Sequence, residues 1–169
     1  MNLVDRYLAV YGESVRQQVV RLIETNKLQS YLDSRYAQAH DVKTDADLRQ
    51  FVMGYKNQYL KKSSPLSKVV YDNKIHVIKN ALGTHSYVNR VQGSKIKSKN
   101  EIHVSSVFKA APKAFLEMIV VHELAHIKEK DHNKAFYQLC QHMLPDYHQL
   151  EFDMRLYLIQ RERLKSGVS

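Results

Sequence analysis

The feature that most constrains this chain is the run His-Glu-Leu-Ala-His at residues 122–126, which lies inside an otherwise apolar segment. In an α-helix, residues four apart share a face, so the two histidines would lie one turn apart with Glu123 beside them. The preceding residues 119–121 are Ile-Val-Val, so we expect this helix to be apolar nearly all round and buried. Imidazole and carboxylate groups are costly to bury without partners. The motif therefore predicts a metal site, in preference to a hydrogen-bonded structural cluster.

The residue types in the motif indicate the chemistry of that site. Two neutral imidazoles bind a borderline-soft divalent ion, and a third protein ligand leaves a fourth position for water, so we expect one Zn²⁺ per chain. Glu123 lies where a carboxylate can take a proton from a metal-activated water and return it to the leaving group. Glu123 is accordingly the predicted catalytic base.

The third metal ligand has two candidates in the sequence. His132 follows His126 at the separation used by the metzincin signature, but that signature has a glycine midway, where this chain has Glu129. The turn must therefore be made differently, and Asp131 is expected to cap a helix that starts near His132. The alternative ligand is Glu151, supplied from a later helix. We favour His132 because the short loop makes its approach easy.

The same stretches resemble a known family. Residues 120–129 and 132–137, together with 69–77 and 148–153, are similar to the YgjP-like metal-dependent hydrolases, a zincin-like group related to the SprT and WLM metalloproteases. In that family three histidines bind the metal and the glutamate is catalytic, which implies these roles for His122, His126, His132 and Glu123. Many members carry Arg-Trp-Gly-Ser-Cys before the active-site helix, whereas residues 90–95 here are Arg-Val-Gln-Gly-Ser-Lys.

The pattern of the whole chain predicts an α+β fold: one zincin-like domain over residues 1–169. Its expected parts are N-terminal helices within 1–62, a small antiparallel sheet within 66–110, and the active-site and C-terminal helices within 112–165. Within these parts we expect helices around 15–23, 44–61, 113–128, 132–143 and 146–163, a hairpin over 69–78, and strands over 86–91 and 102–108.

Composition is that of a globular protein, with 44% hydrophobic and 25% charged residues. No run of about eighteen apolar residues suits a membrane span, and the N-terminal residues lack the pattern of a signal peptide. The single cysteine, Cys140, is expected to be a buried small residue in a helical stripe with Phe136, Leu139 and Met143. These features favour the cytoplasm.

Positive charge is concentrated in one part of the chain. The net charge is +9, and residues 55–113 alone hold twelve Lys and Arg residues against two acidic ones. This segment either forms a solvated basic face or attracts an anionic substrate or partner, with nucleic acid among the partners considered. Arg90 is the predicted anion clamp because its planar fork can bind phosphate or carboxylate bidentately, with Lys95 beside it.

The remaining histidines and one tyrosine are weaker candidates. His76, His85 and His103 are expected to be structural or exposed. His142, His148 and Tyr137 follow the predicted ligands in sequence and could stabilise a transition state or orient a ligand.

Three functions fit these observations. The first is a metallopeptidase, the usual class of proteins with this motif. The second is a metal-dependent nucleoside triphosphate pyrophosphohydrolase, in which the same water attacks phosphorus. The third is a nucleic-acid-binding protein with structural zinc, which is disfavoured because structural zinc usually has four protein ligands, often thiolates, and this chain has one cysteine.

Overall fold

The structure is a computed structural model that describes residues 2–75, 83–92 and 95–167, with backbone alone for 83–92 and 95–99. The chain divides into two compact units. We call Met1–Gln38 with His148–Ser169 the helical unit, and Ala39–Tyr147 the sheet unit. The expected α+β class is confirmed. No described helix is long and apolar enough to cross a membrane.

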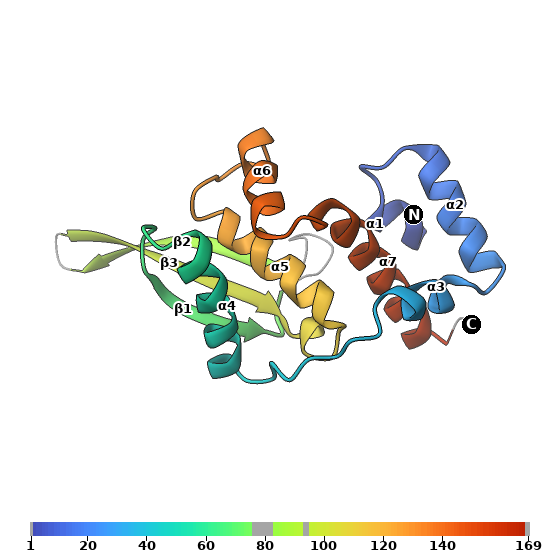
Figure 1. Cartoon of the computed structure of the whole chain (residues 1–169), viewed down its shortest axis with the longest axis horizontal. Coiled ribbons are helices and arrows are strands. Elements are labelled where there is room, and N and C mark those ends of the chain that lie inside the picture. Colours follow the sequence, from blue (N-terminus) through green and yellow to red (C-terminus); the bar gives the residue numbers. More distant parts are fainter. Residues whose placement is uncertain (1, 76–82, 93–94, 168–169) are drawn as a thin grey trace. The chain divides into compact units, whose positions relative to one another are not determined.

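The helical unit contains α1 (Leu3–Tyr7), α2 (Glu13–Glu24), α3 (Leu28–Arg35) and all of α7 (Tyr147–Lys165) except its first residue, Tyr147, which belongs to the sheet unit; the helices are labelled in Figure 1. Helix α2 covers the apolar spacing that predicted it, and α7 covers the predicted 146–163 segment. Polar contacts tie α7 to the N-terminal helices. Glu162 accepts hydrogen bonds from Arg6 Nη2 and from the hydroxyl of Tyr7, each at 2.8 Å.

The sheet unit contains α4 (Asp45–Tyr59), β1 (Leu66–Asp72), β2 (Gly83–Gln92), β3 (Lys95–Ser105), a 3₁₀ turn η1 (Ser106–Lys109), α5 (Lys113–Ala125) and α6 (Lys134–Met143). Helix α4 packs on β1, and α5 packs on β2, β3 and α6 (Figure 1). The start of α4 is fixed by the predicted capping box. The Thr44 hydroxyl accepts from the Asp47 N–H at 3.0 Å, and the Asp47 carboxylate accepts from the Thr44 N–H at 3.2 Å.

The sheet has the strand order β1-β3-β2. Strands β2 and β3 pair antiparallel as predicted, but β1 pairs parallel to β3, with Val69 opposite Ile102, so the expectation of an antiparallel sheet was wrong for this pair. The reason is topological. Alternation of apolar residues predicts a strand but carries no information on its direction relative to a non-adjacent partner. The second arm of the hairpin expected over 69–78 falls mostly in 76–82, outside the described residues.

The core of the sheet unit is centred on α5. All but one of its residues from Phe115 to Ala125 are buried, including His122 and Glu123. On the facing strand β3, Ile102 and Val104 are fully buried. One member of the basic segment is also internal, since Lys56 is only 4% exposed and its Nζ donates to the Ser63 carbonyl oxygen at 3.3 Å. Lys56 therefore does not belong to a basic surface.

Candidate metal centre

Helix α5 ends within the motif, and this ending shapes the site. The helix stops at Ala125 with His126 as its C-cap, three residues earlier than predicted. The N–H groups of Lys128 and Glu129 both reach the Ala125 carbonyl oxygen, at 3.1 and 3.0 Å. No residue of this turn has a positive φ, so the chain reverses without the left-handed conformation that favours glycine. This geometry explains how Glu129 can occupy the position of the metzincin glycine.

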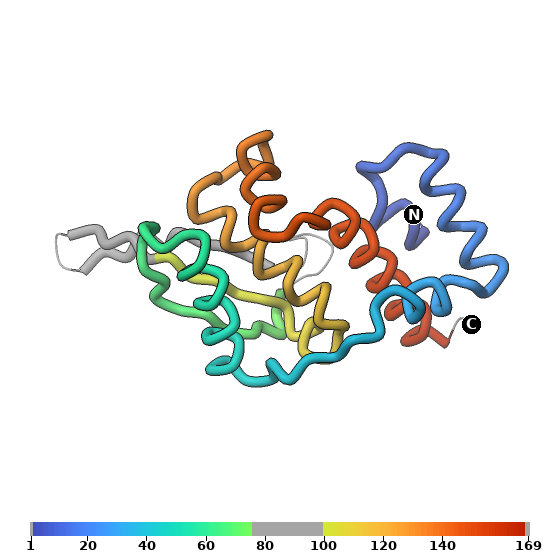
Figure 2. The backbone as a smooth tube through the Cα atoms, viewed as in Figure 1, coloured from blue at the N-terminus to red at the C-terminus, as the bar shows by residue number. Residues whose placement is uncertain are grey.

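Helix α6 begins later than the sequence predicted. Its N-cap is Asn133, whose side-chain oxygen accepts from the Phe136 N–H at 2.8 Å, and its first helical residue is Lys134. The expectation that Asp131 caps a helix starting near His132 was therefore wrong, because the amide two residues later makes the capping bond. His132 lies instead in the loop between α5 and α6, which Figure 2 traces as the backbone turns back beside the end of α5.

The three predicted histidines meet at one point. His126 Nε2 lies 3.3 Å from His122 Nε2 and 2.9 Å from His132 Nε2. Their ligand atoms all lie within 4.8 Å of one another, and in the described part of the chain no other group of three or more His, Cys, Asp or Glu side chains is so arranged. Exposure increases along the series from buried His122 through His126 to exposed His132. The histidine cluster is therefore shielded from solvent at His122 and accessible to solvent at His132.

The protonation pattern of His126 follows from its surroundings. Its Nδ1 lies 2.9 Å from the Glu129 carbonyl oxygen, which can only accept, so Nδ1 carries the hydrogen. Burial lowers the pKa of His126, which favours the neutral ring. A neutral ring protonated at Nδ1 presents a lone pair at Nε2, the atom that faces the other two histidines. This is the tautomer that a metal ligand requires.

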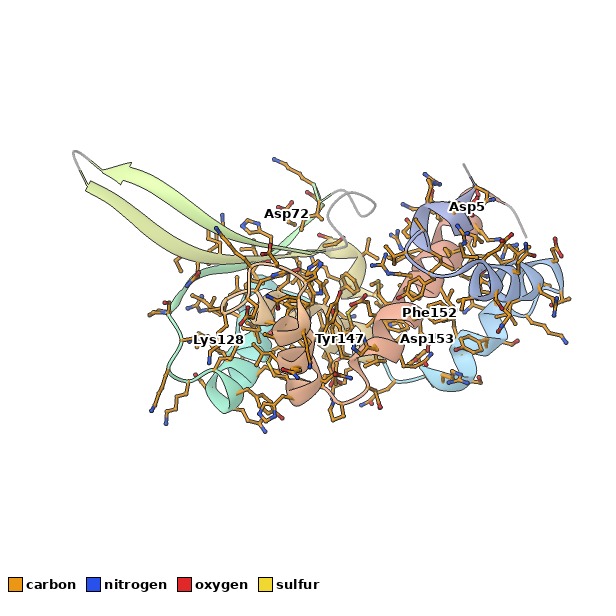
Figure 3. All side chains as sticks on the ribbon, turned by 90° about the horizontal axis from the view of Figure 1, so that it is seen from above. Asp5, Asp72, Lys128, Tyr147, Phe152 and Asp153 are labelled. Carbon is orange, nitrogen blue, oxygen red and sulfur yellow. The ribbon has the colours of Figure 1, made fainter. Side chains whose placement is uncertain are left out.

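His122 contacts a residue that the sequence did not indicate. Its Nδ1 lies 2.6 Å from the hydroxyl oxygen of Tyr147, which is fully buried at the first position of α7. Figure 3 labels Tyr147 among the side chains of the sheet unit. The same arrangement therefore recurs at two ligands: Nδ1 engages a second group and Nε2 faces the cluster.

Glu123 lies deeper than any of the three histidines. It is 1% exposed, and its Oε2 is buried with no hydrogen-bond partner among the described residues. Burial raises the pKa of the Glu123 carboxyl well above its usual range. A buried carboxylate oxygen without a partner is uncommon in a folded protein, and next in sequence to a histidine of the cluster it is available to a bound water or ion.

These observations fit a divalent ion held by three imidazoles. Two nitrogens that bind one Zn²⁺ tetrahedrally at about 2.0–2.1 Å lie roughly 3.3 Å apart, close to the two nitrogen separations observed. The donor set is neutral nitrogen throughout, which suits zinc better than calcium or magnesium. The exposure of His132 leaves one side of the cluster accessible, as a site that admits water and substrate requires.

The other predicted site residues are placed as follows. Glu151, the alternative third ligand, lies on α7 in the helical unit with its Oε1 3.9 Å from Arg155 Nη2. His142 is exposed, with its ring edge 5.4 Å from the ring of Tyr59. Tyr137 is half-buried, with its ring centroid 6.3 Å from that of His132. His148 is exposed at the start of the helical unit.

Several sequence predictions concern side chains outside the described residues. These are the substrate-binding pair Arg90 and Lys95, and two of the histidines, His76 and His85. His103 is described and contacts two acids, with Nδ1 3.2 Å from Asp72 Oδ2 and Nε2 3.7 Å from Glu101 Oε1. It therefore has the structural partners expected of it.

Sequence reasoning missed Tyr147 and the carbonyl group of Glu129. Tyr147 is 25 residues from His122 and begins a separate helix, so no periodicity connects the two. The carbonyl of Glu129 is a backbone group that any residue would supply. Pro145 indicates that a new helix begins after it. Nothing in the sequence indicates which side chain in the first turn of that helix faces the histidines.

Comparison with known proteins adds two matches. The profile of a family described as YgjP-like, metallopeptidase domain, matches residues 6–156. A UTP pyrophosphatase of Escherichia coli (strain K12) is 58% identical over 154 residues, which cover 91% of this chain and 92% of that protein. No solved structure matches.

Proposed function

The chain belongs to the YgjP-like family and is a metal-dependent hydrolase, and from this premise we propose that it is a zinc enzyme that cleaves UTP into UMP and pyrophosphate. The observation that carries the hydrolase chemistry is the convergence of three imidazole nitrogens beside a buried carboxylate that lacks a partner. The choice of substrate is supported by the similar UTP pyrophosphatase, which aligns along nearly its whole length.

In this proposal His122, His126 and His132 hold the ion through Nε2. When bound, the ion supplies a Lewis acid that lowers the pKa of a coordinated water. Glu123 accepts the proton of the attacking water. A bond forms between the water oxygen and phosphorus, the bond from phosphorus to the pyrophosphate oxygen breaks, and Glu123 returns the proton to the leaving group. The buried position of Glu123 makes its carboxylate a stronger base than an exposed one.

The exposure gradient of the cluster suggests where the substrate enters. His122 and Glu123 are buried in α5, whereas His132 stands exposed on the loop before α6. A triphosphate would therefore approach from the side of this loop. Lys128, Lys130 and Lys134 are all exposed on this loop and the first residue of α6, so the approach carries positive charge from described residues.

A peptidase is the second candidate function. The family description names a metallopeptidase domain, and the same base and ligands would serve the hydrolysis of an amide. The two candidates differ in the atom attacked and in the charge of the substrate. The third reading, a protein with structural zinc and no activity, is set aside because the family and the similar protein are hydrolases. Nucleic acid as a partner stays a prediction.

Product analysis separates the two enzymatic candidates. Zinc-loaded protein is incubated in parallel with UTP, CTP, ATP and a library of unmodified peptides, and products are identified by mass spectrometry. Release of UMP and pyrophosphate in equal amounts, abolished by a chelator and restored by zinc, supports the proposal. Cleavage of peptides with no turnover of any nucleotide would replace it by the second candidate.

The basic segment gives a prediction about substrate charge. If Arg90 and Lys95 line the approach, their double replacement by alanine raises KM for UTP and leaves zinc content unchanged, because neither residue can ligate the metal. The effect should shrink as salt rises, since the Debye length falls to about 10 Å near 0.1 M. Lys61→Ala with Lys62→Ala removes equal charge from an exposed turn after α4 and serves as control. Equal changes in the two double variants would show that the charge is only a solvated face.

A further inference from the structure

Tyr147 contacts a ring nitrogen of His122 from a helix that begins 25 residues further along the chain. Its hydroxyl lies 2.6 Å from His122 Nδ1, its side chain is fully buried, and its ring stacks near the His122 ring at 6.3 Å with an interplanar angle of 20°. Phe136 also contacts the His122 ring, at 5.0 Å between centroids. The ring of His122 is therefore enclosed on several sides.

We propose that Tyr147 is a positioning residue that fixes the tautomer and ring orientation of His122, so that Nε2 is held as a metal ligand. This inference rests on the proposed metal-binding role of His122. It concerns the affinity of the site and makes no claim about the substrate.

The argument follows from the hydrogen-bonding capacity of the two groups. A neutral imidazole carries one hydrogen, at Nδ1 or at Nε2. If the hydrogen is at Nε2, it points toward His126 Nε2 at 3.3 Å and blocks ligation. If it is at Nδ1, it is donated to the Tyr147 hydroxyl oxygen, and Nε2 presents its lone pair to the cluster. The Tyr147 hydroxyl, 2.6 Å from Nδ1, can accept this hydrogen, so the second form keeps the Tyr147 bond and also leaves Nε2 able to bind a metal.

The three ligands differ in how they are oriented. His126 donates from Nδ1 to the Glu129 carbonyl oxygen, a backbone group that no substitution at residue 129 removes. His132 is exposed, and its Nε2 lies 2.9 Å from His126 Nε2. His122 contacts a side chain, the Tyr147 hydroxyl, which a substitution can remove. A substitution at Tyr147 can therefore change metal affinity without altering a ligand.

The test is Tyr147→Phe, which keeps the ring and removes the hydroxyl. Zinc affinity is measured by competition with a chromophoric chelator, so no substrate is needed. Loss of a partner of a metal-ligating histidine typically weakens binding 10–100-fold, and this loss is expected here. In parallel, the ¹⁵N shifts of the metal-free protein should report His122 protonated at Nδ1 in the wild type and a mixture of tautomers in the variant.

The control is Tyr71→Phe, which also removes a buried tyrosine hydroxyl from the sheet unit. That hydroxyl donates to the Val42 carbonyl oxygen at 2.7 Å and is bonded to none of the three histidines. Zinc affinity should be unchanged in this variant. If Tyr147→Phe binds zinc as tightly as the wild type, or if both variants lose affinity equally, the positioning role is wrong. Weakened zinc binding in a protein that does not hydrolyse UTP would support Tyr147 and reject the substrate, which separates the two proposals.

Discussion

Asp153 in the helical unit and Glu123 in the sheet unit are both carboxylates with almost no exposure, 0% and 1%, but their surroundings differ. Asp153 accepts hydrogen bonds from the hydroxyls of Tyr31 and Tyr36 and from the side-chain amide of Gln149. Glu123 Oε2 has no partner among the described residues. Of these two buried carboxylates, Asp153 accepts hydrogen bonds on both oxygens, whereas Glu123 has one oxygen without a partner in the described part of the chain.

This contrast in hydrogen bonding suggests a structural role for Asp153 and a functional role for Glu123. A buried charge whose hydrogen bonds are complete holds elements together, here α3 and the segment after it to α7. A buried carboxylate oxygen without a partner is costly to stability, and the position of Glu123 in the histidine motif is the reason we propose a catalytic role for it. Figure 3 labels Asp153 and Phe152 on α7 and Tyr147 at its first residue, so one helix contributes to both kinds of cluster.

The largest effect is expected from replacing Glu123, whose Oε2 has no hydrogen-bond partner among the described residues. Glu123→Gln keeps the size of the side chain and removes its basicity, so turnover should fall on the order of 10²–10⁴-fold with zinc content and fold retained. Steady-state hydrolysis and metal analysis of the same sample check both parts. Glu117→Gln is the matched control, because Glu117 lies on the same helix and its oxygen accepts from the Tyr55 hydroxyl at 2.8 Å, a bond that an amide can keep. Comparable turnover in the two variants would place the proton transfer elsewhere.

Replacing Asp153, the hydrogen-bonded carboxylate, should lower stability instead of metal-dependent turnover. Asp153→Asn places an amide NH₂ against hydroxyl and amide donors, which leaves buried groups unpaired and should cost about 3 kcal/mol of stability. Zinc affinity should not change. Hydrogen exchange of the α7 amides reports this loss locally, which avoids assuming that both units unfold together. Asp33→Asn, at an exposed acceptor of a Gln29 amide bond, should stay within about 0.5 kcal/mol. Reduced zinc affinity in Asp153→Asn would contradict the purely structural role assigned to Asp153.

A smaller effect is expected at high pH. Burial, followed by the hydrogen bond to Asp153 and its charge, raises the pKa of Tyr31 from 10.0 to about 12. Because the folded pKa lies above the unfolded value, this contribution to stability is complete below about pH 10 and is lost as the pH rises toward 12. Tyr31 is half-buried, so solvent screens part of the effect. Denaturant unfolding at about pH 9 and pH 11.5 should show a smaller pH-dependent loss for Tyr31→Phe than for the wild type. An equal loss would mean that Tyr31 and Asp153 are only weakly coupled.

Local sequence could predict the elements whose formation depends on residues close together in the chain. Helix α5 followed from its apolar run, the start of α4 from Thr44 and Asp47, and strand β2 from its alternation. The convergence of His122 and His126 follows from helical spacing alone. His132 could be placed near them because a six-residue separation across a turn limits its distance.

The parts that sequence could not predict have non-local causes. The parallel pairing of β1 with β3 depends on the path of the chain between them, and the residues paired, such as Val69 and Ile102, are far apart in sequence. Asn133 and Asp131 are both good helix caps, and the choice between them was decided by the turn after α5. Tyr147 contacts His122 across 25 residues of sequence, and nothing in its own neighbourhood distinguishes it from a core tyrosine.

The most direct test of the account is the metal content of the histidine cluster. Native mass spectrometry of protein loaded with one equivalent of zinc, followed by removal of excess metal, should show one ion per wild-type chain. His132→Ala should lose most of it, whereas Glu151→Ala should keep it, because three nitrogens converge at His122, His126 and His132. Full zinc in His132→Ala together with loss of zinc in Glu151→Ala would contradict this assignment and make the glutamate the third ligand.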